Sequence, residues 1–159
     1  IIYTGPAKVR EDFEAIIEHA DRITVNLESA RELVLLSELA TKKGVKVRCG
    51  LRVVTSSQKG WTKFGQPLTA LKDFFDQASA LSGIEFCGMH FHISMNKVPD
   101  KYVSTLQEIG EYMQANFSSD ERACFQYIDI GGGYYPCPFE GTHAWNPNKR
   151  CPSLLERSI

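Results

Sequence analysis

Three consecutive glycines, Gly131 to Gly133, follow directly after the apolar run that ends at Ile130. Glycines allow the backbone to approach a ligand closely and to turn several N–H groups toward one anion, which is how a loop holds a phosphate. A flexible turn would contain the same residues. The spacing matches neither a dinucleotide-binding fingerprint nor a P-loop, because no Gly-Lys-Ser/Thr follows. The triplet therefore predicts a phosphate cradle, with a simple turn as the alternative.

A second group of chemical interest is the pair His90 and His92, at the end of another apolar run. Residues two apart on a strand point to the same side, so both imidazoles are expected on one face. The pair could ligate a metal. One ring could instead stack on a flat heteroaromatic cofactor held by the glycines, or it could be a hydrogen-bonded core residue.

The elements that must position these groups alternate between strand-like and helix-like patterns. Such alternation is typical of repeated βα units around a parallel sheet. The expected strands are 1–4, 22–27, 45–54, 84–93 and 124–130, and the expected helices are 10–19, 29–42, 100–116 and one that begins at Pro67 and ends before Gly83. We therefore expect a barrel segment at 1–136, followed by an irregular, proline-containing tail at 137–159.

The side-chain alternation of these strands favours a barrel over an open sheet. Each expected strand has one apolar and one polar face, whereas an open sheet covered by helices on both sides should have almost continuously apolar strands. In a barrel the outer face packs on helices, and the inner face can become polar where a ligand enters at the carboxyl ends. We thus predict an α/β fold, a partial TIM-type (β/α)8 barrel of about five parallel strands. Four polar side chains should converge at its mouth: Asn26, Arg52, His92 and Asp129.

Composition excludes several classes of partner. The chain has 159 residues and a net charge of -1, which leaves no electrostatic footprint for nucleic acid or a membrane surface. No apolar run approaches the roughly 20 residues that cross a bilayer. The five cysteines form no CxxC pair, and Cys137, His143 and Cys151 match no zinc module. A small-molecule partner and a cytoplasmic location are the expectations.

Two motifs together resemble a known family. Gly88-Met89-His90-Phe91-His92, followed about 37 residues later by Asp129-Ile130-Gly131-Gly132-Gly133, is similar to the pattern shared by pyridoxal-phosphate-dependent decarboxylases of fold type III, which have an alanine-racemase-like barrel. These include the diaminopimelate, ornithine, arginine and carboxynorspermidine decarboxylases. Further stretches match in the same order: Thr4–Lys8, Leu27–Ser29, Leu51–Val53 and Lys63–Gly65.

The resemblance implies a fragment of a decarboxylase that acts on a basic or dibasic amino acid and is a homodimer when complete. It also implies roles for cofactor binding: His92 stacks on the pyridine ring, Gly131 to Gly133 bind the phosphate, and Arg52 lines the cofactor. The family's Ser after His-x-Gly is not reproduced, since the run here is His92-Ile93-Ser94-Met95. Either Ser94 substitutes for it or fewer donors hold the phosphate.

The resemblance places no catalytic residue in this chain. The family's Schiff-base lysine lies on the strand before Ile1, and its acidic partner of the pyridine nitrogen lies on a strand after this chain. Lys8 is not that lysine, because it follows the turn of the next strand. Two alternatives stay open: a non-catalytic, decarboxylase-like binding protein, and a metal-dependent hydrolase barrel that uses His90 and His92.

Overall fold

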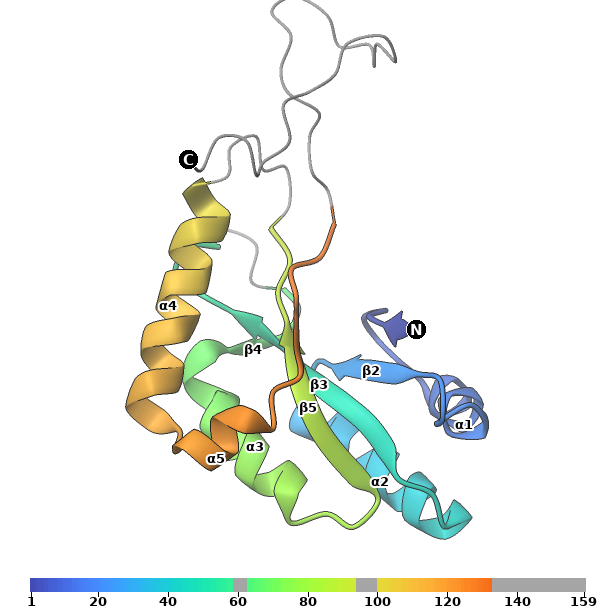
Figure 1. Ribbon diagram of the computed structural model, residues 1–159. Coiled ribbons are helices and arrows are strands. Elements are labelled where there is room, and N and C mark those ends of the chain that lie inside the picture. Colours follow the sequence, from blue (N-terminus) through green and yellow to red (C-terminus); the bar gives the residue numbers. More distant parts are fainter. Residues whose placement is uncertain (59–62, 94–99, 133–159) are drawn as a thin grey trace, which may run out of the picture.

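A computed structural model describes residues 1–58, 63–93 and 100–132. Its elements are β1 (Ile2–Tyr3), α1 (Arg10–Glu18), β2 (Thr24–Leu27), α2 (Ala30–Lys43), β3 (Val47–Val54), β4 (Gln66–Pro67), α3 (Leu71–Ser79) after a 3-10 turn (Leu68–Ala70), β5 (Ile84–His90), α4 (Asp100–Asn116), α5 (Ser119–Ala123) and β6 (Tyr127–Asp129) (Figure 1). The predictions for Ser94, Gly133 and the tail 137–159 lie outside the described residues.

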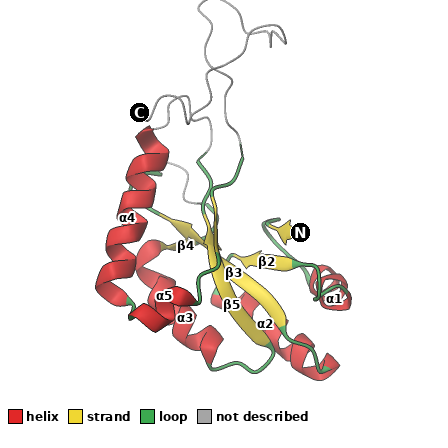
Figure 2. Ribbon diagram, in the orientation of Figure 1, coloured by secondary structure: helices red, strands yellow, loops and turns green. Residues whose placement is uncertain are grey.

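Five strands form one parallel sheet in the order β1, β2, β3, β5 and β6, and the short β4 pairs with β3 beside this path. Figure 2 shows helices around the outside of this sheet, with β3 and β5 side by side at its centre. The predicted partial TIM-type barrel is confirmed. Within the described part of the chain, β1 and β6 end the sheet, so the barrel is open on one side.

The sheet is curved, and one side-chain contact demonstrates it. Neighbouring strands lie about 4.8 Å apart, so the four steps from β1 to β6 would separate these strands by roughly 19 Å in a flat sheet. Yet the hydroxyl Oγ1 of Thr4, directly after β1, donates to Oδ2 of Asp129 in β6 at 3.3 Å. The two outermost strands therefore face each other across the concave side of a half-barrel.

Helix ends follow local chemistry. Ser29 caps α2 by accepting the N–H of Glu32 at 3.3 Å, and Gly44 ends that helix in the left-handed region at a φ of 70°. The short helix α5 was not predicted. It begins with a capping box, in which Ser118 and Glu121 each accept the other's backbone N–H. The strand β4 was also missed, since two residues give no readable period.

The strands are shorter than predicted, and β5 departs from strict alternation. Its register with β3 shifts, since Cys49 pairs with Phe86 but Gly50 pairs with Gly88, which leaves Cys87 as an extra residue. Strict alternation would place Phe86 on the same face as Gly88. Its ring instead packs with aromatic rings on the outer side: Phe74, Phe75 and Phe125. The bulge therefore turns Phe86 toward the helices.

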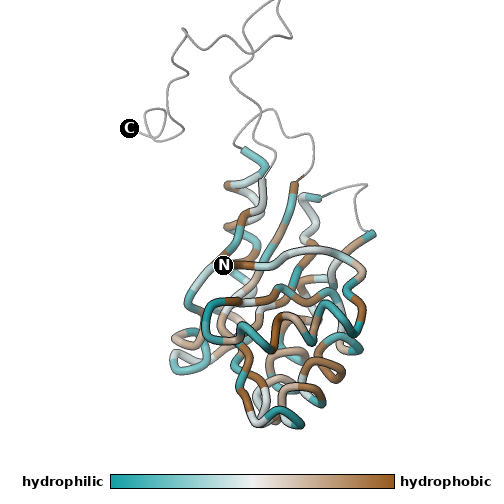
Figure 3. Tube along the Cα trace, turned by 90° about the vertical axis from the view of Figure 1, so that its right-hand side faces the viewer, coloured by the Kyte–Doolittle hydropathy of each residue, from teal (hydrophilic) through white to brown (hydrophobic). Residues whose placement is uncertain are grey.

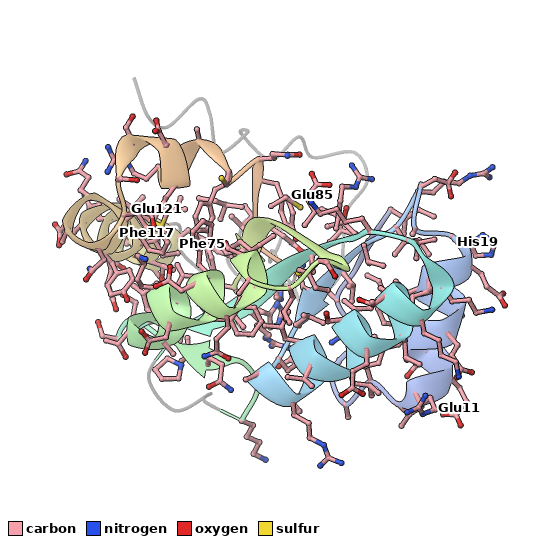
Figure 4. All side chains as sticks on the ribbon, turned by 90° about the horizontal axis from the view of Figure 1, so that it is seen from below. Glu11, His19, Phe75, Glu85, Phe117 and Glu121 are labelled. Carbon is pink, nitrogen blue, oxygen red and sulfur yellow. The ribbon has the colours of Figure 1, made fainter. Side chains whose placement is uncertain are left out.

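The hydrophobic core lies between the outer face of the sheet and the helices. Figure 3 shows the apolar stretches gathered in the body of the domain, and Figure 4 shows Phe75 and Phe117 close together, with His19 at the periphery. The apolar face predicted for β3 is confirmed, because Val47, Cys49, Leu51 and Val53 are all fully buried. The polar side chains are thus left for the concave face.

Candidate cofactor-binding site

The carboxylate of Asp129 is the centre of the polar group on the concave face. Its Oδ2 accepts hydrogen bonds from Thr4 Oγ1 at 3.3 Å and from Asn26 Nδ2 at 3.1 Å, and it lies 3.1 Å from Nδ1 of His90. Its Oδ1 accepts the backbone N–H of Gly131 at 2.9 Å. One carboxylate thus connects residues from four of the five barrel strands or the turns directly after them.

His90 is held in a defined tautomer by this carboxylate. Its Nδ1 lies 3.1 Å from both the backbone oxygen and Oδ2 of Asp129, and both are acceptors, so Nδ1 bears the proton. Burial lowers the pKa of His90, and the charge of Arg52 adds to this, although Asp129 opposes it. We therefore interpret the contact with Asp129 as a hydrogen bond of a neutral imidazole, not as an ion pair.

The glycine segment begins at Gly131, whose backbone conformation and close neighbours require a residue without a side chain. Gly131 has a φ of 72°, and a Cβ there would lie 2.8 Å from Nδ1 of His92 and 2.9 Å from the carbonyl oxygen of Phe91. Since its N–H donates to Asp129, that particular donor is committed within the protein. Around Gly132 a Cβ would meet nothing within 4 Å.

His92 lies at the carboxyl end of β5 with its ring against Gly131. Burial lowers the pKa of His92, the positive charge of Arg52 lowers it further, and Asp129 acts in the opposite direction. A half-buried imidazole that is neutral at physiological pH is suited to lie flat on an aromatic ring. Stacking by His92 stays a prediction, and the geometry is compatible with it.

Arg52 is buried at the mouth and held from three sides. Its Nη1 donates to Oε1 of Glu28 at 3.1 Å, its guanidinium lies 5.4 Å from the ring centroid of Phe64, and Gly65 packs on its backbone. The other carboxylate oxygen of Glu28, Oε2, is buried and accepts no hydrogen bond from the described residues. A buried acceptor without a partner requires an explanation, and a bound ligand would supply the missing donor.

The predicted convergence is confirmed for the four polar side chains. Asn26 donates directly to Asp129, and the charges of Arg52 and Asp129 both act on His92. Sequence reasoning missed three supporting residues: Glu28, Gln58 and Tyr127. A signal existed for Tyr127, since Gly50 and Gly88 lie on the inward faces of adjacent strands and leave room for one large side chain.

Lys8 is engaged in an ion pair inside the protein. The side chain of Lys8 is fully buried, and its Nζ contacts Oε2 of Glu32 at 3.2 Å, near the start of α2.

In residues 1–58, 63–93 and 100–132 no group of three potential metal ligands occurs, and the Cys137, His143 and Cys151 set lies outside them. No helix in those ranges is long and apolar enough to span a bilayer.

The residues at the mouth fit a flat, anionic cofactor. A neutral imidazole offers a ring face, a buried guanidinium offers positive charge, and Glu28 offers an unused acceptor. The glycine segment begins beside that imidazole.

Comparison with known proteins agrees with this chemistry. Residues 1–155 match the family model described as "Pyridoxal-dependent decarboxylase, pyridoxal binding domain". The diaminopimelate decarboxylase of Aquifex aeolicus is 30% identical over 147 residues, which are 84% of this chain and 34% of that protein. The enzyme of the same name from Campylobacter jejuni is 27% identical over 84% of this chain and 35% of its own length. This chain therefore spans about a third of the curated relatives it matches.

Solved structures extend the likeness to the fold. The crystal structure of AQ1208 from Aquifex aeolicus has a TM-score of 0.61 and 31% identity, over 84% of this chain and 31% of that one. Diaminopimelate decarboxylase from M. jannaschii has a TM-score of 0.75 at 18% identity, over 98% of this chain and 37% of that one, which supports the fold alone. Because the family model matches residues 1–155 of this 159-residue chain, the chain belongs to the pyridoxal-dependent decarboxylases, within their pyridoxal-binding domain.

Proposed function

We propose that this chain is the central barrel segment, residues 1–136, of a pyridoxal-phosphate-dependent enzyme that decarboxylates a basic or dibasic amino acid. The observation that carries the proposal is the contact of His92 with Gly131 at the carboxyl end of β5. A ring-stacking group and a phosphate-binding backbone must lie side by side if one cofactor is to occupy both.

The chain's own residues would bind and orient the cofactor. His92 would lie against one face of its ring, Arg52 would line its side, and Gly131 to Gly133 with Ser94 would hold its phosphate. Within that segment the N–H of Gly131 already donates to Asp129, so the phosphate donors would be the N–H groups of Gly132 and Gly133. When bound, pyridoxal phosphate supplies an electron-withdrawing ring that accepts the electron pair left when carbon dioxide departs.

The relatives support the proposed substrate class. Two curated relatives are named diaminopimelate decarboxylase, and structures of that enzyme from Helicobacter pylori and M. jannaschii are described as complexed with L-lysine. By analogy, a basic or dibasic amino acid is proposed here. The complete enzyme is proposed to be a cytoplasmic homodimer, as is usual for the family. Cys49 and Cys87 of this chain are buried as free thiols, which is compatible with that location.

The test uses the complete polypeptide that contains this chain. Release of carbon dioxide should be measured with diaminopimelate, ornithine and arginine, together with the visible absorbance of bound pyridoxal phosphate. His92→Ala should weaken cofactor binding by about tenfold or more, as expected for loss of an aromatic contact of roughly 1.5 kcal/mol. His19→Ala, which removes an exposed imidazole, is the matched control. If the wild-type protein binds no cofactor, the proposal is wrong.

A non-catalytic, decarboxylase-like binding protein is the second candidate. The departure at Ser94-Met95 from the family's pattern favours it, because a site with fewer phosphate donors than the family's is less suited to hold the cofactor for catalysis. The same experiment separates the two, since a binding protein would take up pyridoxal phosphate without releasing carbon dioxide from any of the three amino acids.

A further inference from the structure

Tyr127 crosses the concave face from one strand to another. It lies on β6, and its hydroxyl donates to Oδ1 of Asn26 on β2 at 2.6 Å, so its ring passes over β5 and β3. Glycines on those two strands make room for it. A Cβ at Gly88 would lie 2.4 Å from its Cε1, and one at Gly50 would lie 2.4 Å from its hydroxyl.

The hydrogen bond from Tyr127 fixes which way the Asn26 amide faces. Burial raises the pKa of Tyr127 above its usual range, so the hydroxyl stays protonated and acts as a donor. Because Oδ1 of Asn26 accepts this hydrogen bond, the amide N–H group points the other way, to Oδ2 of Asp129 at 3.1 Å. A flipped amide would set its oxygen against the carboxylate, and Asn26 is fully buried, where two opposed acceptors are costly.

The same chain of hydrogen bonds reaches the glycine segment. While Oδ2 of Asp129 is held by Asn26, its Oδ1 accepts the N–H of Gly131 at 2.9 Å. Gly131 has a φ of 72° and touches the ring of His92, so the direction of the backbone after it depends on where that N–H is anchored.

We propose that Tyr127 and Asn26 are positioning residues, which act through Asp129 to hold the glycine turn in the conformation that binds the cofactor's phosphate. The proposal rests on the function proposed above. Neither side chain would touch the cofactor. Their effect should therefore fall on the part of the affinity that the phosphate contributes.

The experiment compares two ligands that differ only in the phosphate. Dissociation constants of pyridoxal phosphate and of pyridoxal are measured on the complete polypeptide, and their ratio is the readout. Tyr127→Phe keeps the ring but removes the hydroxyl, and it should reduce the preference for the phosphorylated ligand by about tenfold, the effect of one lost hydrogen bond. Asn26→Leu, of similar volume, should do the same.

The double variant provides the decisive arm. If both residues act through one chain of bonds, Tyr127→Phe should add little to the change caused by Asn26→Leu. Tyr112→Phe is the matched control, because it removes a tyrosine hydroxyl that donates to the carbonyl of Thr69 at 2.9 Å on the surface. Thermal unfolding of each variant verifies that it is folded.

The outcomes separate the two proposals. A wild-type protein that binds neither ligand, or has no preference for the phosphorylated one, overturns the proposed function and this inference with it. A wild-type preference that survives in Tyr127→Phe and Asn26→Leu, or effects of the two changes that simply add, overturns the positioning role alone. An equal loss of affinity for both ligands means that the residues only stabilise the fold.

Discussion

Gln58 donates from Nε2 to the carbonyl oxygen of His92 at 2.7 Å. Its Oε1 accepts the N–H of Thr55 at 2.7 Å, and the side chain is buried. The loop after β3 is thereby attached to the carboxyl end of β5, and Ser56 anchors the same loop to Glu108 of α4. The residue proposed to stack on the cofactor is thus held from its backbone side by a residue of another strand's loop.

Replacing Gln58 by glutamate should destabilise the protein. The substitution preserves shape and the acceptor for Thr55, but it places a carboxylate oxygen against the carbonyl of His92. We expect a loss of about 1–3 kcal/mol in the free energy of unfolding, the cost of an unsatisfied buried polar contact. Urea denaturation measures it. Gln77→Glu makes the same chemical change at an exposed position of α3 and should leave the free energy of unfolding almost unchanged. Equal effects at both sites would contradict the role of Gln58 in holding the backbone of His92.

Alanine substitutions at two glycines should have opposite effects. A Cβ at Gly88 would collide with the ring of Tyr127 at 2.4 Å, whereas one at Gly110 within α4 would meet nothing within 4 Å. Gly88→Ala should cost about 1–3 kcal/mol through overpacking. Gly110→Ala should stabilise by about 0.5–1 kcal/mol, because alanine is the better helix former. The denaturant midpoint should therefore fall for Gly88→Ala and rise for Gly110→Ala.

The identity of the colliding group can be tested as well. The three atoms nearest to a Cβ at Gly88 all belong to the side chain of Tyr127. Gly88→Ala should therefore cost much less in a Tyr127→Leu background, which lacks the ring. If the cost is the same in both backgrounds, the glycine is needed for a reason other than space for Tyr127.

The fold could be predicted largely from sequence because its signals are local and repeated. Alternating faces in β3 and helical spacing in α2 each give many agreeing residues. The bulge at Cys87 could not be foreseen, because it depends on pairing with β3, which one strand's own pattern does not contain. The same holds for the strand β4, which exists only through its pairing with β3.

Within the site, the residues at strand ends were predictable and their supports were not. Asn26, Arg52, His92 and Asp129 lie on inward faces, which a period of two identifies. Gln58 lies in a loop, where no periodicity exists, so its contact with His92 could not be inferred.

The buried imidazole of His90 should make stability depend on pH. Its pKa is lowered, chiefly by burial, so below about pH 6.5 the unfolded chain takes up a proton that the folded protein resists. The unfolded state then binds more protons, and stability falls as the pH drops through this range toward the folded pKa. His90→Asn retains a donor to Asp129 but cannot titrate there. This variant should therefore lose less stability in acid than the wild type does.

The measurement compares urea midpoints above and below about pH 6.5. His19→Asn is the matched control, since it removes an exposed imidazole at the end of α1 (Figure 4). The interpretation fails if His90→Asn loses as much stability in acid as the wild type, or if His19→Asn changes the acid response to the same extent.

The buried Nζ of Lys8 lies 3.2 Å from Oε2 of Glu32. Glu32 uses the same Oε2 to accept the N–H of Glu28 at 2.7 Å, so this amine is tied to the start of α2. Treatment with pyridoxal phosphate and borohydride, followed by peptide mapping, should label the exposed Lys42 but leave Lys8 unlabelled. In the complete polypeptide the dominant label should lie outside residues 1–159, and residues 1–159 alone should release no carbon dioxide from diaminopimelate. Labelling of Lys8, or decarboxylation by this chain alone, would mean that the reactive lysine lies inside it after all.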